Sequence, residues 1–137
     1  MAVIIVVEDN EGLRNQLVVL LGEISTPPHT VAGFGSVYEC AKEWDKIRPD
    51  VLLTDWQLPR SNGGQLIKDL KRRGKLPPVV ILMSSDKKKR AVAEELGVSF
   101  HSKEEDSVEH ILQLINEGLA RLKGDGNDDT DSGRRGR

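Results

Sequence analysis

The most constraining feature of the sequence is a set of short apolar runs in which apolar and polar residues do not alternate. The runs "VIIVV" at 3–7, "VLL" at 51–53 and "VVILM" at 79–83 are rich in β-branched residues. A strand with one face in water alternates apolar with polar residues, so these runs indicate strands that are covered on both faces, as in a parallel sheet. Weaker runs at 30–32 and 98–100 bring the number of expected strands to five.

Between these runs, apolar residues recur every three or four positions, which predicts amphipathic helices. The expected helices cover 13–24, 37–44, 66–70, 87–96 and 108–122. The second opens with the capping-box pattern of Ser36 and Glu39, and Gly97 ends the fourth. Strand and helix alternate five times, which predicts an α/β fold with a doubly wound five-stranded parallel sheet flanked by five helices.

Length and composition limit the organisation of the chain. Its 137 residues suit one domain, which we expect at 1–123. Residues 124–137 are polar and glycine-rich, so we expect a disordered linker or tail there. Cys40 is the only cysteine, which excludes an intramolecular disulfide. The net charge of −2, together with the lack of a basic leader and of a long apolar run, predicts a cytoplasmic protein without nucleic-acid or membrane binding.

Polar residues follow four of the expected strands. In an open parallel sheet the ligands bind at the carboxyl ends of the strands, so these side chains should share one crevice. Carboxylates that cluster in this way repel one another unless a cation lies among them, and Mg²⁺ prefers oxygen ligands. The residues at these strand ends are Glu8, Asp9, Asp55, Ser84 and Lys103.

Each of these residues also has an ordinary structural explanation. Glu8 and Asp9 precede a helix and can cap it, and Ser84 can cap another helix. Asp55 can simply end a strand before a turn, and Lys103 can be a solvated surface lysine. Their joint placement at the strand ends is what favours a phosphoryl-transfer site.

Three segments resemble the receiver domains of bacterial two-component response regulators, and the resemblance extends from residue 3 to about 122. They are "IIVVEDN", "PDVLLTDWQLPRSNGGQL" and "PPVVILMSS". The resemblance implies the flavodoxin-like receiver fold, with Asp55 as the phosphorylated residue. It also implies Mg²⁺ ligands at Glu8, Asp9, Asp55 and the backbone carbonyl of Gln57. Ser84 would be the switch hydroxyl, Lys103 the characteristic lysine of the family and Phe100 the switch aromatic.

The same resemblance implies how the protein works. A sensor histidine kinase or a phosphotransfer domain would donate a phosphoryl group from phosphohistidine to Asp55. The domain would catalyse its own phosphorylation and slow dephosphorylation and would have no other enzymatic activity. A downstream output protein or domain would bind the face formed by the fourth helix, fifth strand and fifth helix, and a homodimer is a further expectation. The sequence departs from the family after Lys103, where Glu104 replaces the usual proline.

Two other functions remain as alternatives. A degenerate receiver would use the same fold as an unphosphorylated interaction module. A Mg²⁺-dependent phosphatase would need a second acid shortly after its nucleophile, and Trp56, Gln57 and Leu58 follow Asp55 instead. The basic run 87–90 is either a solvated face or a docking patch for an acidic partner. We expect the three histidines, His29, His101 and His110, to be scattered and without a catalytic role.

Overall fold

The computed structural model describes residues 2–24, 26 and 28–127. The elements are β1 (Val3–Val7), α1 (Glu11–Val19), the π-helical turn η1 (Leu20–Ile24), β2 (Thr30–Phe34), α2 (Val37–Ile47), β3 (Val51–Asp55), β4 (Gln57–Leu58), β5 (Ser61–Asn62), α3 (Gly63–Arg72), β6 (Val79–Ser84), α4 (Lys89–Leu96), β7 (Ser99–Ser102) and α5 (Val108–Asn127).

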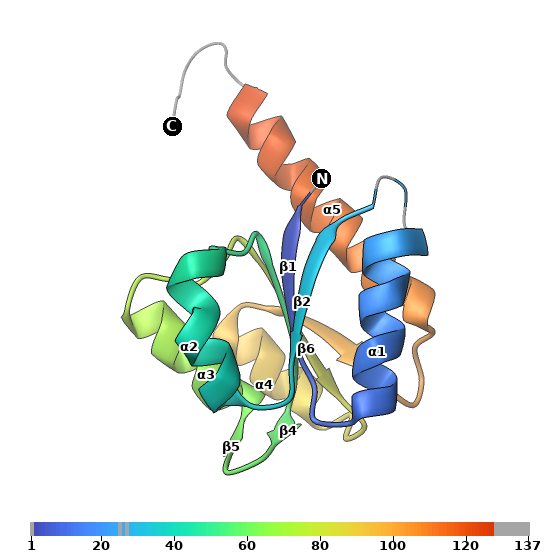
Figure 1. Ribbon diagram of the computed structural model, residues 1–137. Coiled ribbons are helices and arrows are strands. Elements are labelled where there is room, and N and C mark those ends of the chain that lie inside the picture. The colour runs from blue at the N-terminus through green and yellow to red at the C-terminus, as the bar shows by residue number, and fades with distance from the viewer. Residues whose placement is uncertain (1, 25, 27, 128–137) are drawn as a thin grey trace.

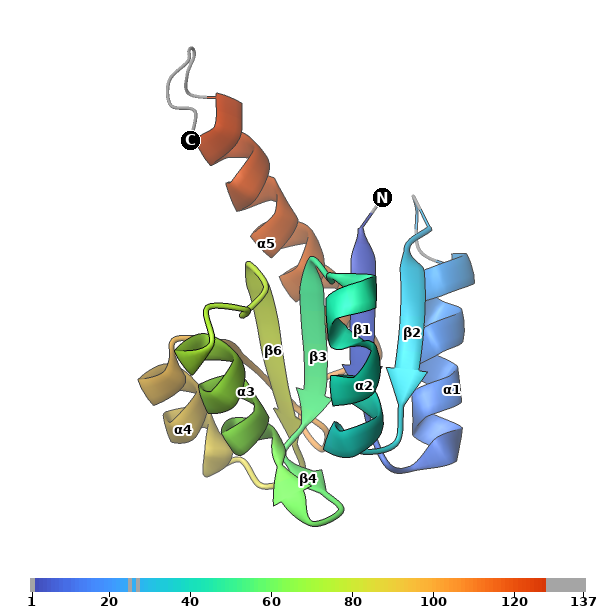
Figure 2. The ribbon, with the colours of Figure 1, turned by 60° about the vertical axis from the view of Figure 1, so that its left-hand side comes forward.

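Five strands form one parallel sheet in the order β2-β1-β3-β6-β7. The predicted doubly wound fold is therefore confirmed. Figures 1 and 2 show α1 and α5 on one face of the sheet and α2, α3 and α4 on the other. All five strands run in the same direction, so their carboxyl ends lie at the same edge of the sheet. Figure 2 shows the ends of β1, β2 and β3 at the lower edge.

Successive residues of the buried strands serve two different cores, which is why the runs show no polar alternation. Ile4 and Val6 pack with α1 and α5, whereas Ile5 and Val7 pack with α2, α3 and α4. The side chains of a strand point alternately to opposite faces of its sheet, so a strand covered on both faces needs apolar residues at consecutive positions. The middle strand β3 is buried along its whole length.

Several element boundaries differ from the sequence-based expectation. The fourth helix begins at Lys89 and not at residue 87, because the side chain of Asp86 accepts a hydrogen bond from the Lys88 N–H at 3.0 Å and the chain first makes a turn. The turn expected after Asp55 forms a small hairpin of β4 and β5. Helix α5 continues to Asn127, four residues past the expected domain boundary, and the rest of the expected tail, residues 128–137, lies outside the described residues.

Within the described ranges, no helix is both long enough and apolar enough to span a bilayer.

Candidate functional site

The first acidic residue of the site lies directly after β1 and is almost completely buried. Glu8 is 1% exposed, and its N–H donates to the Phe34 carbonyl at 2.9 Å. Its Oε2 accepts a hydrogen bond from the Asn10 N–H at 3.1 Å. The N-cap of α1 is Asn10, whose Oδ1 accepts from the Leu13 N–H at 2.9 Å. The acidic pair is therefore not the cap of α1, and the capping explanation does not account for it.

Asp55 ends β3, and backbone hydrogen bonds of the next residue, Trp56, fix its position. Asp55 is 5% exposed, and the Trp56 N–H donates to the Met83 carbonyl of β6 at 2.7 Å. The Gly63 N–H donates to the Trp56 carbonyl at 2.8 Å. A Cβ atom on Gly63 would lie within 2.3 Å of the Asp55 carbonyl oxygen, so only glycine fits this approach of α3 to β3.

Lys103 joins the two acidic positions. Its N–H donates to the Ser84 carbonyl at 2.9 Å, which extends the pairing of β6 with β7 by one residue. Its Nζ lies 2.9 Å from Asp55 Oδ2 and 2.9 Å from Glu8 Oε1, and 23% of its side chain is exposed. Lys103 is therefore a part of the site and not a solvated surface lysine.

Burial and charge shift the protonation equilibria of these three groups. Burial raises the pKa of Glu8 above its ordinary value, and Lys103 opposes this shift. Burial likewise raises the pKa of Asp55, again against the effect of Lys103. Burial alone would lower the pKa of Lys103, but the carboxylates of Glu8 and Asp55 raise it, so the ammonium form persists.

The acidic residues fit a small divalent cation. Glu8, Asp9 and Asp55 each offer one carboxylate oxygen, and these oxygens lie within 4.8 Å of one another. Glu8 Oε1 is buried, and the Lys103 ammonium lies 2.9 Å from it. One ammonium balances only part of the charge of three neighbouring carboxylates, and a divalent cation would balance the rest. The donor set consists of oxygen atoms, which suits Mg²⁺, and Gln57, the source of the expected carbonyl ligand, begins β4 two residues after Asp55.

Two further expected residues lie at the ends of β6 and β7. Ser84 is 5% exposed, and its Oγ accepts a hydrogen bond from the Asp86 N–H at 3.0 Å. Because α4 begins only at Lys89, Ser84 is not the N-cap of that helix. Phe100 pairs with Leu82 in the sheet and is buried, and its ring lies 4.9 Å from the guanidinium carbon of Arg90.

The basic run at 87–90 has partners within the molecule that the sequence did not reveal. Lys89 Nζ lies 4.5 Å from the centre of the Trp56 ring, next to Asp55. Arg90 covers Phe100 in the same way, and Lys87 lies 3.7 Å from Glu105. A basic residue three or four positions from an aromatic residue would signal such a pair on a helix, but these partners come from other strands and loops. Lys87, Lys88 and Arg90 are exposed and Lys89 is partly buried, so most of the run lies on a solvated face, and the docking patch stays a prediction.

The expectation that the histidines are scattered is wrong for two of them. His101 of β7 and His110 of α5 lie with their Nδ1 atoms 3.1 Å apart, whereas His29 accepts a hydrogen bond from the Ala2 N–H at 3.1 Å. The spacing of nine residues between His101 and His110 fits neither one helix nor one strand, so no local pattern signals their contact.

The chain is similar to longer bacterial regulators. It is 29% identical to a protein-glutamate methylesterase/protein-glutamine glutaminase of Treponema denticola, over 87% of this chain and 33% of the relative. It is 28% identical to the sensory transduction protein RegX3 of Mycolicibacterium smegmatis, over 94% of this chain and 54% of the relative. The chain thus spans between a third and about half of the length of these curated relatives.

The fold also matches that of solved structures. The receiver domain of the Francisella response regulator 1452 superposes with a TM-score of 0.78 at 18% identity, covering 89% of this chain and 99% of that one. At this identity the likeness concerns the fold alone. The family model described as "Response regulator receiver domain" matches residues 4–115, which is most of the chain. The chain therefore belongs to the receiver-domain family of two-component response regulators.

Proposed function

We propose that this receiver domain accepts a phosphoryl group on Asp55 from the phosphohistidine of a sensor histidine kinase or phosphotransfer domain. The observation that carries the proposal is the position of Lys103, whose ammonium lies 2.9 Å from both Asp55 Oδ2 and Glu8 Oε1. A fixed cation beside a carboxylate nucleophile at the open edge of the sheet is what a phosphoryl acceptor needs to balance the charge of the incoming group.

We propose that Glu8, Asp9 and Asp55 hold Mg²⁺, with the Gln57 backbone carbonyl as a further ligand. The close approach of the three carboxylates supports this. When bound, the ion would neutralise charge on the phosphoryl oxygens and help to orient them. Lys103 balances only part of the carboxylate charge, which is a further reason to expect a divalent cation here.

In the transfer itself, a carboxylate oxygen of Asp55 forms a bond to phosphorus while the phosphorus–nitrogen bond of the donor breaks. The imidazole nitrogen of the donor leaves with the electron pair of that bond. Lys103 stays protonated, because its carboxylate neighbours raise its pKa, and it can pair with one phosphoryl oxygen. Ser84 Oγ accepts a hydrogen bond from the Asp86 N–H, which leaves the Ser84 hydroxyl proton free to donate to a second phosphoryl oxygen.

The signal would pass from Ser84 to the face formed by α4, β7 and α5. A phosphoryl group adds up to about two negative charges, which can draw the Ser84 hydroxyl toward Asp55. The hydrogen bond from the Lys103 N–H to the Ser84 carbonyl connects this movement to β7, where the Phe100 ring lies under Arg90. A change from mostly inactive to mostly active needs roughly 5 kcal/mol of differential stabilisation.

The partner that binds the face formed by α4, β7 and α5 is an output protein, a further domain or a second copy of the chain. The lengths of the curated relatives support an output domain in the same polypeptide. A cytoplasmic location, the lack of direct nucleic-acid binding and the lack of enzymatic activity beyond the domain's own phosphorylation and dephosphorylation belong to the same proposal. Lys103 contacts Asp55 although Glu104, and not proline, follows it, which weighs against the degenerate-receiver alternative.

The test is incubation with Mg²⁺ and a small phosphodonor, followed by intact mass measurement. We expect one phosphoryl adduct on the wild-type protein and none on Asp55→Asn. Asp69→Asn is a matched control, since Asp69 is a partly exposed aspartate on α3 that pairs with Arg72, and this variant should accept phosphate like the wild type. An adduct on Asp55→Asn, or none on the wild type with Mg²⁺ present, would contradict the proposal.

A further inference from the structure

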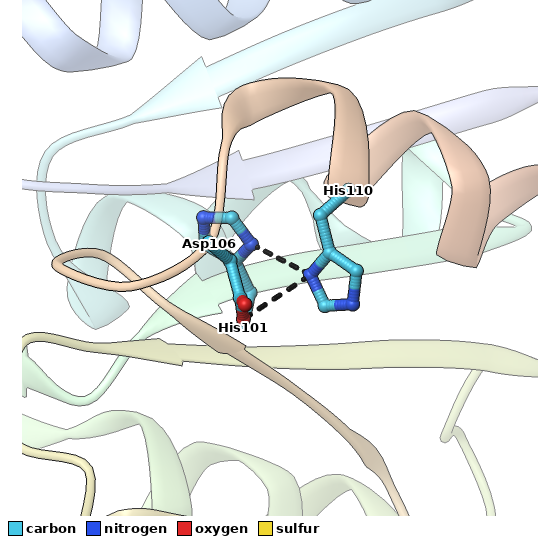
Figure 3. A group of neighbouring side chains, drawn as sticks. All are labelled: His101, Asp106 and His110. Atoms are coloured by element: carbon cyan, nitrogen blue, oxygen red, sulfur yellow. Dashed lines mark hydrogen bonds and ion pairs between the residues drawn. The ribbon is translucent and has the colours of Figure 1, made fainter.

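A second group of potential metal ligands lies on the α5 side of β7, opposite to the side on which Phe100 packs, and does not belong to the acidic site. It consists of His101 at the end of β7, Asp106 in the following turn and His110 in the first turns of α5. Figure 3 shows the three side chains converging on one point. His110 Nδ1 lies 3.1 Å from His101 Nδ1 and 3.3 Å from Asp106 Oδ2, and the two rings stack with centroids 5.3 Å apart.

Two of the three distances between the potential ligand atoms are close to those of a tetrahedral metal site. Zn²⁺ binds imidazole nitrogen and carboxylate oxygen at about 2.0–2.2 Å, which places neighbouring ligand atoms of a tetrahedron roughly 3.3–3.5 Å apart. The observed 3.1 and 3.3 Å lie close to this range, and each residue offers one ligand atom within 4.8 Å of those of the other two. The group could thus receive a metal ion with small side-chain movements.

The backbone of the turn holds the carboxylate in place. Asp106 Oδ2 accepts a hydrogen bond from the Ser102 N–H at 2.9 Å, and the Asp106 N–H donates to the Ser102 carbonyl at 3.0 Å. Ser102 Oγ in turn accepts from the Glu105 N–H at 3.0 Å. Outer contacts of this kind orient metal ligands and reduce the entropy lost on binding.

His101 is buried, whereas His110 is partly exposed to solvent. His101 is 4% exposed, and burial lowers its pKa to about 4, so its imidazole is neutral near pH 7. The side chains of His110 and Asp106 are 28% and 26% exposed, which leaves a route from solvent and room for a fourth ligand. The neutral imidazole is the form that binds a metal ion.

We propose that His101, Asp106 and His110 form a site for a divalent transition metal of the Zn²⁺ class, which fastens the end of β7 to the start of α5. Its nitrogen-rich donor set differs from the all-oxygen set of Glu8, Asp9 and Asp55, so the two sites should prefer different ions. The inference goes beyond the proposed phosphoryl acceptance and does not depend on it.

The first test uses Co²⁺ as a spectroscopic probe on the chain without a polyhistidine tag, in the presence of saturating Mg²⁺ to occupy the acidic site. We expect one equivalent of Co²⁺ to give the visible absorption of a tetrahedral site, and Zn²⁺ to displace it. His110→Gln and Asp106→Asn each remove one ligand and should weaken binding by more than the roughly 10- to 100-fold that loss of an outer partner costs.

Two matched controls should keep the wild-type affinity. Glu109→Gln changes an exposed acidic residue next to His110 on α5, and His29→Gln removes the remaining histidine. Circular dichroism of each variant checks that it is folded. Equal binding by His110→Gln and the wild type would overturn the proposal.

A second test needs no variant. Zn²⁺ added to the ¹⁵N-labelled wild-type protein should shift the imidazole Nδ1 resonances of His101 and His110 and leave those of His29 unchanged. If one equivalent of Zn²⁺ leaves the first two unchanged, the three residues form a hydrogen-bonded chain without a metal role. Neither test measures phosphorylation, so a negative result here leaves the proposal for Asp55 unaffected.

Discussion

Replacement of Gly63 by alanine should both destabilise the fold and displace Asp55. Gly63 is the first residue of α3, and its Cα faces the backbone of β3. A Cβ atom built there lies 2.3 Å from the Asp55 carbonyl oxygen and 3.0 Å from Leu82 Cδ1. Cβ atoms essentially never approach another heavy atom within 3.0 Å, so α3 and β3 must separate by at least 0.7 Å.

The cost follows from which atoms are in the way. The carbonyl oxygen belongs to the backbone of a fully buried strand and also accepts a hydrogen bond from Thr54 Oγ1 at 3.1 Å, so it cannot turn aside as a side chain would. Overpacking of this kind costs about 1–3 kcal/mol. For a domain of this size, that corresponds to a decrease in melting temperature of roughly 3–5 °C per kcal/mol.

Gly12→Ala is the matched control. Gly12 lies on the exposed side of α1, and a Cβ there meets its nearest atom, Asn10 Oδ1, at an ordinary 3.4 Å. Alanine in a helix is favoured over glycine, so we expect Gly12→Ala to stabilise the protein by about 0.4–1 kcal/mol. Urea unfolding followed by circular dichroism measures both variants.

The two variants should also differ in phosphoryl acceptance. A displacement of the Asp55 backbone approaching 1 Å should slow phosphorylation by up to about 100-fold, whereas Gly12→Ala should react like the wild type. A free energy of unfolding of Gly63→Ala within about 0.5 kcal/mol of the wild-type value would refute the argument, since a surface substitution without steric conflict falls in that range.

Three further predictions concern the site and the cores. Mg²⁺ at about 100 times its dissociation constant should stabilise the wild-type protein by roughly 2.7 kcal/mol, and Glu8→Gln should remove most of this gain in a thermal melt. Burial raises the pKa of the Cys40 thiol to about 12, so iodoacetamide at pH 8 should label Cys40 only after unfolding, and rapid labelling of the folded protein would contradict this. Burial lowers the pKa of His29, so its neutral form is favoured in the folded state. The contribution of His29 to the free energy of unfolding should be fully present above pH 6.5 and should decrease as the pH falls below that value. His29→Gln should make that decrease shallower, as measured by urea unfolding at a series of pH values.

The strands and helices were predictable because their signals are local. The uninterrupted apolar runs predicted β1, β3 and β6, and the fold confirms them, since each run supplies both faces of the sheet. The start of α4 was misplaced because Asp86 makes its own hydrogen bond with the following backbone, which competes with helix formation. The extension of α5 to Asn127 was missed, because the polar residues after Lys123 carry no apolar periodicity.

The sequence by itself determined the α/β architecture and the positions of Glu8, Asp9, Asp55, Ser84 and Lys103 at strand ends, because the apolar periodicity and the direction of parallel strands are properties of short segments. Only the tertiary structure decided which of these side chains are in contact. Lys103 reaches Asp55, 48 residues away, because β7 is added beside β6, and the same strand brings His101 to His110 of α5. Such contacts depend on how separate elements pack, so no spacing along the chain encodes them.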